Sequence, residues 1–162
     1  MHILPAIALA LLTPLACAVE PIQVNRPAFG CHEPIVGVQL PKALSKLRKI
    51  GAMITEEVVS TEEWEGYQAV EKRLRFKGLS LQVITFTNQP ERYILGSLEL
   101  TSPQWLVAPI RVGQAAEPVL RTLGVKELKS FGSWRFGGET DTLLVEVHHG
   151  KVGRLLYECY TG

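Results

Sequence analysis

The sequence contains few of the residues from which catalytic and metal sites are built. Asp141 is its only aspartate, so no pair of aspartates is present for acid–base catalysis. His148 and His149 are adjacent, and adjacent side chains of a strand point to opposite faces, so the two cannot easily share a metal ion. His32 could be a ligand beside Cys31, but a disulfide would occupy that thiol. No Gly-rich phosphate loop is present. The sequence therefore predicts no enzyme, no metal site and no cofactor.

Net charge is also nearly absent. The chain has 17 Lys and Arg against 16 Asp and Glu, which gives a formal net charge of +1. Proteins that bind nucleic acid usually carry a clear excess of basic residues. The composition therefore argues against a nucleic-acid partner, and it gives no reason to expect any other polyanion.

The N-terminal segment is apolar and has no charged side chain before Glu20. An apolar run of this length is short for a membrane span and is typical of a signal peptide. Ala16-Cys17-Ala18 fits a small-x-small cleavage site, which predicts a signal peptide over residues 1–18 and a periplasmic or secreted protein with no transmembrane segment. Lipidation at Cys17 is the alternative, and Pro14 argues against it because that signal has Leu at this position.

Cleavage after residue 18 would leave two cysteines, Cys31 and Cys159. In an oxidising compartment the two thiols are expected to form a disulfide, with two free thiols as the alternative. The bridge would close almost the whole mature chain, and the loop-closure entropy of so long a loop corresponds to about 4–5 kcal/mol as an upper value.

One phrase occurs twice, as PIVGVQLPKALSKLRKIG over residues 34–51 and as PIRVGQAAEPVLRTLG over residues 109–124. Each copy has a Gly, a Pro and then apolar residues at the spacing of one helix face. The prolines fall in or near the first turn, where a missing N–H is harmless, and a Gly follows each apolar stripe as a C-terminal stop. Each copy therefore predicts a short amphipathic helix.

Segments with alternating apolar and polar residues follow each predicted helix. They are residues 70–76, 79–86 and 92–101 after the first copy, and residues 133–138, 142–149 and 151–161 after the second. Thr87–Pro90 and His149–Gly150 are typical of hairpin connections. The predicted fold class is α+β, with two tandem repeats that each pack a short helix on an antiparallel β-meander. The predicted boundaries are an N-terminal arm over 19–33, repeat 1 over 34–108 and repeat 2 over 109–162, in one compact domain.

The segment from Gly51 to Ala69 has no counterpart in the second copy, and it carries a cluster of glutamates. Ser60 and Glu63 have the spacing of a helix capping box, while ITEEVV could form a further strand. The favoured interpretation is a solvated loop or short helix. The alternative is a recognition loop for a basic cleft, in which Glu62 and Glu63 contact the partner.

One face of the predicted sheet has the composition of a protein-binding surface. If Leu98, Leu100, Tyr157 and Cys159 point to the core, residues of the opposite parity point outward. The outward residues predicted to bind a partner are Phe86, Tyr93, Leu95, Leu156 and Tyr160. A mixture of aromatic, aliphatic and charged side chains suits a protein interface. The alternative is that a loop, the N-terminal arm or a second subunit covers this face.

The second copy resembles a known repeat unit. It reads Ile110-x-Val112-Gly113 and then Val119-x-x-x-Leu123-Gly124, followed by a Trp/Phe strand and the hairpin His149-Gly150-Lys151-Val152. This pattern is similar to the repeat of the β-lactamase inhibitory protein and of the related small lipoprotein of the outer-membrane β-barrel assembly machine. The resemblance covers about residues 34–162 and implies a helix on an antiparallel meander, in two tandem copies as in the inhibitor.

The chain departs from both relatives. The inhibitor has a disulfide within each repeat, and the lipoprotein has one repeat and a clear lipid-attachment Cys, so no binding residue is carried over. The sequence predicts an exported, non-catalytic protein that binds another protein, in the first place an inhibitor or immunity protein against a periplasmic or secreted enzyme. A structural role in envelope assembly is the alternative, and a periplasmic hydrolase with an unrecognised site is the third. The partner's identity and the oligomeric state stay open.

Overall fold

The computed structural model describes residues 22–25, 40–107, 110–137 and 141–159. The elements in chain order are β1 (Ile22–Asn25), α1 (Leu44–Leu47), β2 (Met53–Trp64), β3 (Tyr67–Phe76), β4 (Leu79–Phe86), β5 (Gln89–Leu100), β6 (Leu106–Val107), β7 (Ile110–Arg111), α2 (Ala116–Thr122), β8 (Gly132–Gly137), β9 (Asp141–His148) and β10 (Lys151–Cys159). Within these ranges no helix is long and apolar enough to cross a membrane.

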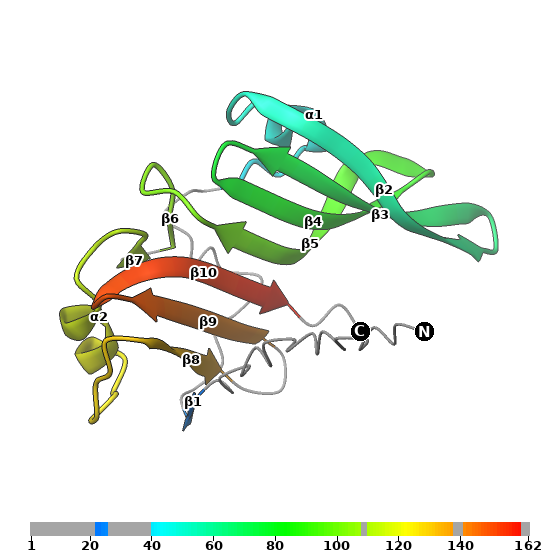
Figure 1. Ribbon diagram of the computed structural model, residues 1–162. Coiled ribbons are helices and arrows are strands. Elements are labelled where there is room, and N and C mark those ends of the chain that lie inside the picture. Colours follow the sequence, from blue (N-terminus) through cyan, green and yellow to red (C-terminus); the bar gives the residue numbers. More distant parts are fainter. Residues whose placement is uncertain (1–21, 26–39, 108–109, 138–140, 160–162) are drawn as a thin grey trace, which may run out of the picture.

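Eight strands form one sheet in the order β1-β8-β9-β10-β5-β4-β3-β2 (Figure 1). Strand β1 is parallel to β8, and every other neighbouring pair is antiparallel. Strands β2 to β5 make one meander and β8 to β10 make another. The two meanders join where β10 pairs with β5, with Leu155 opposite Leu100 and Glu158 opposite Ser97. We call this junction the seam.

The predicted α+β fold of two tandem repeats is wrong. The two helices contain only four and seven residues, and the described chain is mostly antiparallel sheet. The first predicted stripe runs to Ile50, but α1 ends at Leu47 and no side chain caps its N-terminus. Helices this short are marginal without packing, whereas hydrogen bonds at the seam join both meanders into one sheet. The described part of the chain is therefore mostly β, with two short helices.

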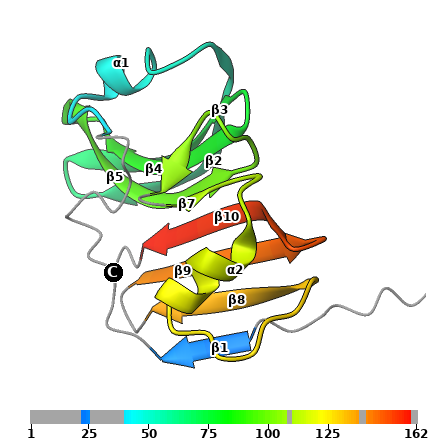
Figure 2. The ribbon, with the colours of Figure 1, turned by 90° about the vertical axis from the view of Figure 1, so that its left-hand side faces the viewer.

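One hydrophobic core lies on a single face of the sheet, and both helices cover that face. Leu44 and Leu47 of α1 belong to the same buried cluster as Leu120 of α2 and the inward residues of β3, β4, β5, β8, β9 and β10. Trp134 and Phe136 are fully buried at its centre. Figure 2 shows α2 lying across β8 to β10 and α1 beside the β2 to β5 meander. The other face of the sheet carries neither helix.

Strand β2 is built from the segment for which the sequence favours a loop or short helix, and the other possibility, a strand that includes ITEEVV, is the one that forms. It pairs with β3 along its length, from Met53 opposite Phe76 to Trp64 opposite Tyr67, and it forms one edge of the sheet. The predicted capping box is therefore wrong, because both of its residues lie within the strand. Glutamate has a low preference for strands, but cross-strand pairing overrides such preferences.

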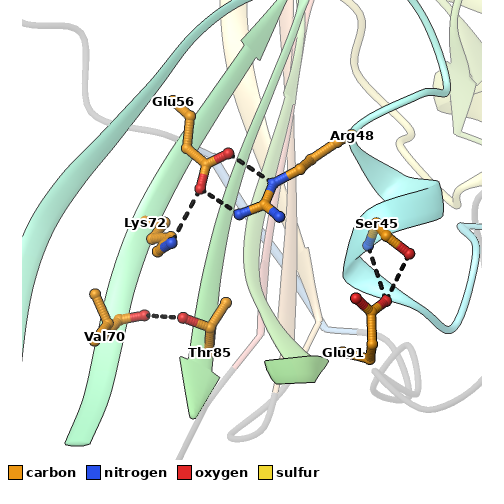
Figure 3. Close-up of polar contacts among 7 residues, drawn as sticks. All are labelled: Ser45, Arg48, Glu56, Val70, Lys72, Thr85 and Glu91. Atoms are coloured by element: carbon orange, nitrogen blue, oxygen red, sulfur yellow. Dashed lines mark hydrogen bonds and ion pairs between the residues drawn. The ribbon is translucent and has the colours of Figure 1, made fainter. Parts of the chain in front are cut away.

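Polar contacts attach α1 to the edge of the sheet (Figure 3). The Arg48 guanidinium donates two hydrogen bonds to the Glu56 carboxylate, at 2.8 and 2.7 Å, and the Lys72 ammonium adds a third at 3.0 Å. These contacts, with the Arg48 hydrogen bonds first, lower the pKa of Glu56 to about 2. Ser45 donates from its backbone N–H and its hydroxyl to Glu91. The short helix is therefore held at both ends by β2 and β5.

Candidate functional site

The face of the sheet opposite the core is the candidate site, and we call it the open face. Alternation along each strand places two rows of mostly polar side chains across it. One row is Glu57, Arg73, Gln82, Ser97, Glu158 and Thr142, and the other is Thr55, Arg75, Ser80, Glu99, Leu156 and Leu144. Each row crosses the seam, so the open face is one continuous surface from β2 to β9.

A groove of about 640 Å³ runs along the open face at the seam. Side chains of β2, β3, β4, β5 and β10 line it, with Arg73, Arg75 and Gln82 on one side and Leu156 and Glu158 on the other. Leu156 is half-buried and supplies an apolar contact among charged groups. The groove therefore combines hydrogen-bond donors and acceptors with apolar side chains, among them Leu156 and the exposed Ile54.

Ion pairs fix the side chains on the β10 side of the groove. The Arg154 guanidinium donates to Glu99 and to Glu146, each at 2.6 Å. Glu158 accepts a hydrogen bond from Arg135 at 3.0 Å. These carboxylates already accept hydrogen bonds from arginine, so they have little capacity left to bind a cation or a donor of a ligand.

Arg73 differs from these groups. It is half-buried in the centre of β3, and it makes no ion pair with any residue that the structure describes. Its neighbour Arg75 has only a 4.0 Å approach to Glu57. The groove thus presents a guanidinium whose planar set of donors matches a carboxylate or a pair of carbonyl oxygens.

The far end of the open face carries a row of aromatic rings, in which the predicted residue Phe86 is joined by Trp64 and Tyr67, which the sequence does not single out. Trp64 stacks on Tyr67 with ring centroids 6.3 Å apart, Tyr67 meets Phe86 edge-on at 6.1 Å, and Arg92 lies 5.7 Å from the Phe86 ring. Trp64 and Tyr67 flank the β2–β3 turn, so recognising β2 as a strand would have placed them together.

Two of the predicted partner-binding residues do not lie on the open face. Val83 pairs with Leu95 and Gln82 with Ser97, so Gly96 is an extra residue that reverses the alternation of β5. Tyr93 and Leu95 therefore pack against the core. The Tyr93 hydroxyl donates to the carbonyl of Pro41 at 2.6 Å, and burial raises the pKa of Tyr93. The prediction that these two side chains point outward is wrong.

The other predicted residues are divided among several places. Phe86 and Leu156 share the open face, but Leu156 lines the groove and Phe86 lies outside it in the aromatic row. Glu62 and Glu63 are exposed on β2, opposite Ala69 and Gln68 of β3. Tyr160 lies outside the described residues. The structure therefore does not bring these residues into one contiguous patch, and their role in binding stays a prediction.

Two titratable side chains of the described residues, Asp141 and Tyr157, form a hydrogen-bonded pair. Asp141 is buried and accepts a hydrogen bond from the Tyr157 hydroxyl at 2.8 Å, and burial, with this bond, raises the pKa of Tyr157 far above its ordinary value. Within the described ranges, no group of three His, Cys, Asp or Glu could hold a metal ion. Cys159 is half-buried on β10 and disulfide-bonded, while Cys31 lies outside the described residues, so their pairing stays a prediction.

Comparison with known proteins gives no assignment. No family model, curated protein or solved structure matches this chain. The resemblance to the β-lactamase inhibitory protein therefore rests on its short sequence motif alone, and any function has to be argued from the open face itself.

Proposed function

We propose that this protein is an exported, non-catalytic binding protein that holds a protein partner against the open face of its sheet. The partner in this proposal is a periplasmic or secreted enzyme that the protein inhibits or neutralises. The observation that carries the proposal is the groove at the seam, where Arg73 has no ionic partner among the described residues.

The composition of the groove favours a protein segment over a small molecule. Small-molecule sites are mostly apolar with a few polar groups, whereas eight of the thirteen residues that line this groove are polar or charged. Arginine is enriched at the energetic centre of protein interfaces, and Leu156 adds an apolar contact beside it. Charges already fixed in ion pairs, such as Arg154 with Glu99, would give shape and specificity at the rim.

The chemistry of the groove indicates what a partner would insert. An acidic side chain or a turn with outward carbonyl oxygens would satisfy the donors of Arg73. A complex of this kind would desolvate the guanidinium in the middle of the interface, where truncation of a hot-spot residue typically costs about 2–4 kcal/mol of binding free energy.

The test is affinity capture with the immobilised mature protein from a fraction of exported proteins. We expect capture of one enzyme in stoichiometric amount, and a fall in that enzyme's activity when the protein is added. Arg73→Ala and Leu156→Asp should abolish capture. Arg121→Ala is the matched control, because Arg121 is exposed on α2 on the opposite face.

Three outcomes would contradict the proposal. If the groove variants and the control capture the partner equally well, the open face does not bind it. Capture of many outer-membrane proteins and no enzyme would favour a structural role in envelope assembly. Turnover of an ester or cell-wall substrate by the protein itself would favour the hydrolase.

A further inference from the structure

The edge strand β2 carries most of the large hydrophobic side chains that are exposed in the part of the chain that the structure describes. Of the seven large hydrophobic side chains that are exposed in the described chain, five lie on this strand. They are Met53, Ile54, Val58, Val59 and Trp64, with exposed fractions from 40% to 66%. Among the described residues β2 pairs with β3 alone, so the backbone groups on its other side have no strand partner there. An apolar edge of this kind can accept an additional strand.

The last part of β2 is the most regular. Ile54 and Val59 are extra residues at register shifts, which interrupt the first part of the strand. From Ser60 to Trp64, by contrast, each residue pairs in turn with one residue of β3, from Glu71 to Tyr67. This stretch is long enough for a short added strand, because strands in globular proteins are commonly about five residues long.

The charge of the same stretch restricts what could pair with it. Glu62 and Glu63 are exposed, and β2 contains no Lys or Arg. Glu62 makes no ion pair with a described residue, and Glu63 accepts a hydrogen bond from the neutral Gln68. Glu56 differs, because Arg48 and Lys72 already neutralise it. A second copy of this edge would place carboxylates beside carboxylates, and such like-charge pairs are unfavourable.

We propose that the β2 edge, along Ser60–Trp64, binds an extended segment of a partner protein in which two adjacent Lys or Arg residues are flanked by apolar residues. The backbone of the segment adds a strand to the sheet. Adjacent residues of β2 face opposite sides, so Glu62 and Glu63 contact cations on the two faces of the added strand. Val59 and Trp64 supply apolar contacts at either end. This site uses none of the groove residues and is independent of the function proposed for the open face.

The probe is an acetylated and amidated peptide of about eight residues made of Lys, Val and Thr, long enough for strand addition. Binding to the full-length protein is followed by fluorescence anisotropy of the labelled peptide. Glu62→Gln with Glu63→Gln, and separately Val59→Lys, should weaken binding about tenfold, because either change removes complementary contacts. The same peptide methylated on alternate backbone nitrogens keeps its charge and loses donors, and it should also bind about tenfold more weakly.

Two controls separate this site from the rest of the molecule. Glu117→Gln removes an exposed carboxylate from α2, and Arg73→Ala removes a cation from the groove. Both should leave peptide binding unchanged, and circular dichroism checks that every variant is folded. Equal binding of the methylated peptide, or of a peptide with Glu in place of Lys, would overturn the proposal. So would sedimentation that shows a dimer broken by Val59→Lys, because a second copy would then occupy the edge.

Discussion

Arg154 of β10 and Glu99 of β5 form an ion pair across the seam, with 2.6 Å between Nε and Oε1. The same guanidinium donates to Glu146 of β9, also at 2.6 Å. Both contacts lie on the open face, and each of the three side chains is only about one-third exposed or less. One arginine therefore links three neighbouring strands at the place where the two meanders meet.

Replacing Arg154 with Ala should lower the free energy of unfolding by about 1–3 kcal/mol, because two partly buried carboxylates would lose their common cation. Urea unfolding measures the effect. Arg121→Ala is the matched control, since the Arg121–Glu117 pair lies on the helix surface with both side chains about 60% exposed. Exposed pairs of this kind contribute at most about 0.5 kcal/mol. Equal losses in the free energy of unfolding for the two variants would show that the ion pair at the seam stabilises the fold no more than an exposed pair does.

Glu56 predicts a specific dependence of stability on pH. Its pKa falls from 4.5 to about 2 in the folded protein, so the ionised form is stabilised by folding. This contribution is present above pH 4.5 and is lost as the pH falls toward 2. Glu56→Gln should cost about 1–3 kcal/mol at neutral pH and flatten the stability profile in that acid range. A profile as steep in the variant as in the wild type would assign the acid sensitivity to other groups, and Glu62→Gln is the control.

Tyr93 and Phe86 should respond in opposite ways to truncation. Tyr93 packs on the core and hydrogen-bonds the Pro41 carbonyl, so Tyr93→Ala should destabilise by about 2–4 kcal/mol. Phe86 lies on the open face, so Phe86→Ala should cost less stability. Thermal unfolding of both variants checks this. A larger loss for Phe86 than for Tyr93 would mean that the bulge at Gly96 does not turn β5 as described.

The disulfide predicts a mass-spectrometric pattern. Cys159 is bonded, and Cys31 is its predicted partner. Digestion of the unreduced protein should release one cross-linked pair of peptides that contain these two residues. Reduction should lower the thermal midpoint, because closing so long a loop is worth up to about 4–5 kcal/mol. A Cys17–Cys159 peptide, or alkylation of Cys31 without reduction, would contradict the pairing.

Most strands of the sheet could be predicted from the sequence because apolar and polar residues alternate along them. Strands β3, β4, β5, β8, β9 and β10 each overlap one of the six predicted segments, although β5 begins at Gln89, inside the connection predicted over Thr87–Pro90. The turn between β9 and β10 is also predicted from the sequence. His149 and Gly150 both adopt positive φ, 52° and 72°, as a two-residue hairpin of type I′ requires. Local patterns of this kind depend only on neighbouring residues.

The rest depended on contacts between distant segments. Strand β2 is rich in Glu and lacks clear alternation, so only its pairing with β3 makes it a strand. Bulges at Gly96 and Gly153 shift the register by one residue, which moved Tyr93 and Val152 to the core against their expected parity. The open groove arises at the seam, and no local pattern predicts that β10 pairs with β5.

Photo-cross-linking can show on which face of the sheet the partner binds. A photoreactive amino acid replaces Gln82, which lines the groove, or Arg121, which is exposed on α2, and each protein is irradiated with the exported fraction. We expect a cross-link to one enzyme from position 82 and none from position 121. A partner cross-linked from position 121 and absent from position 82 would contradict it, because binding would then lie on the helix side of the sheet.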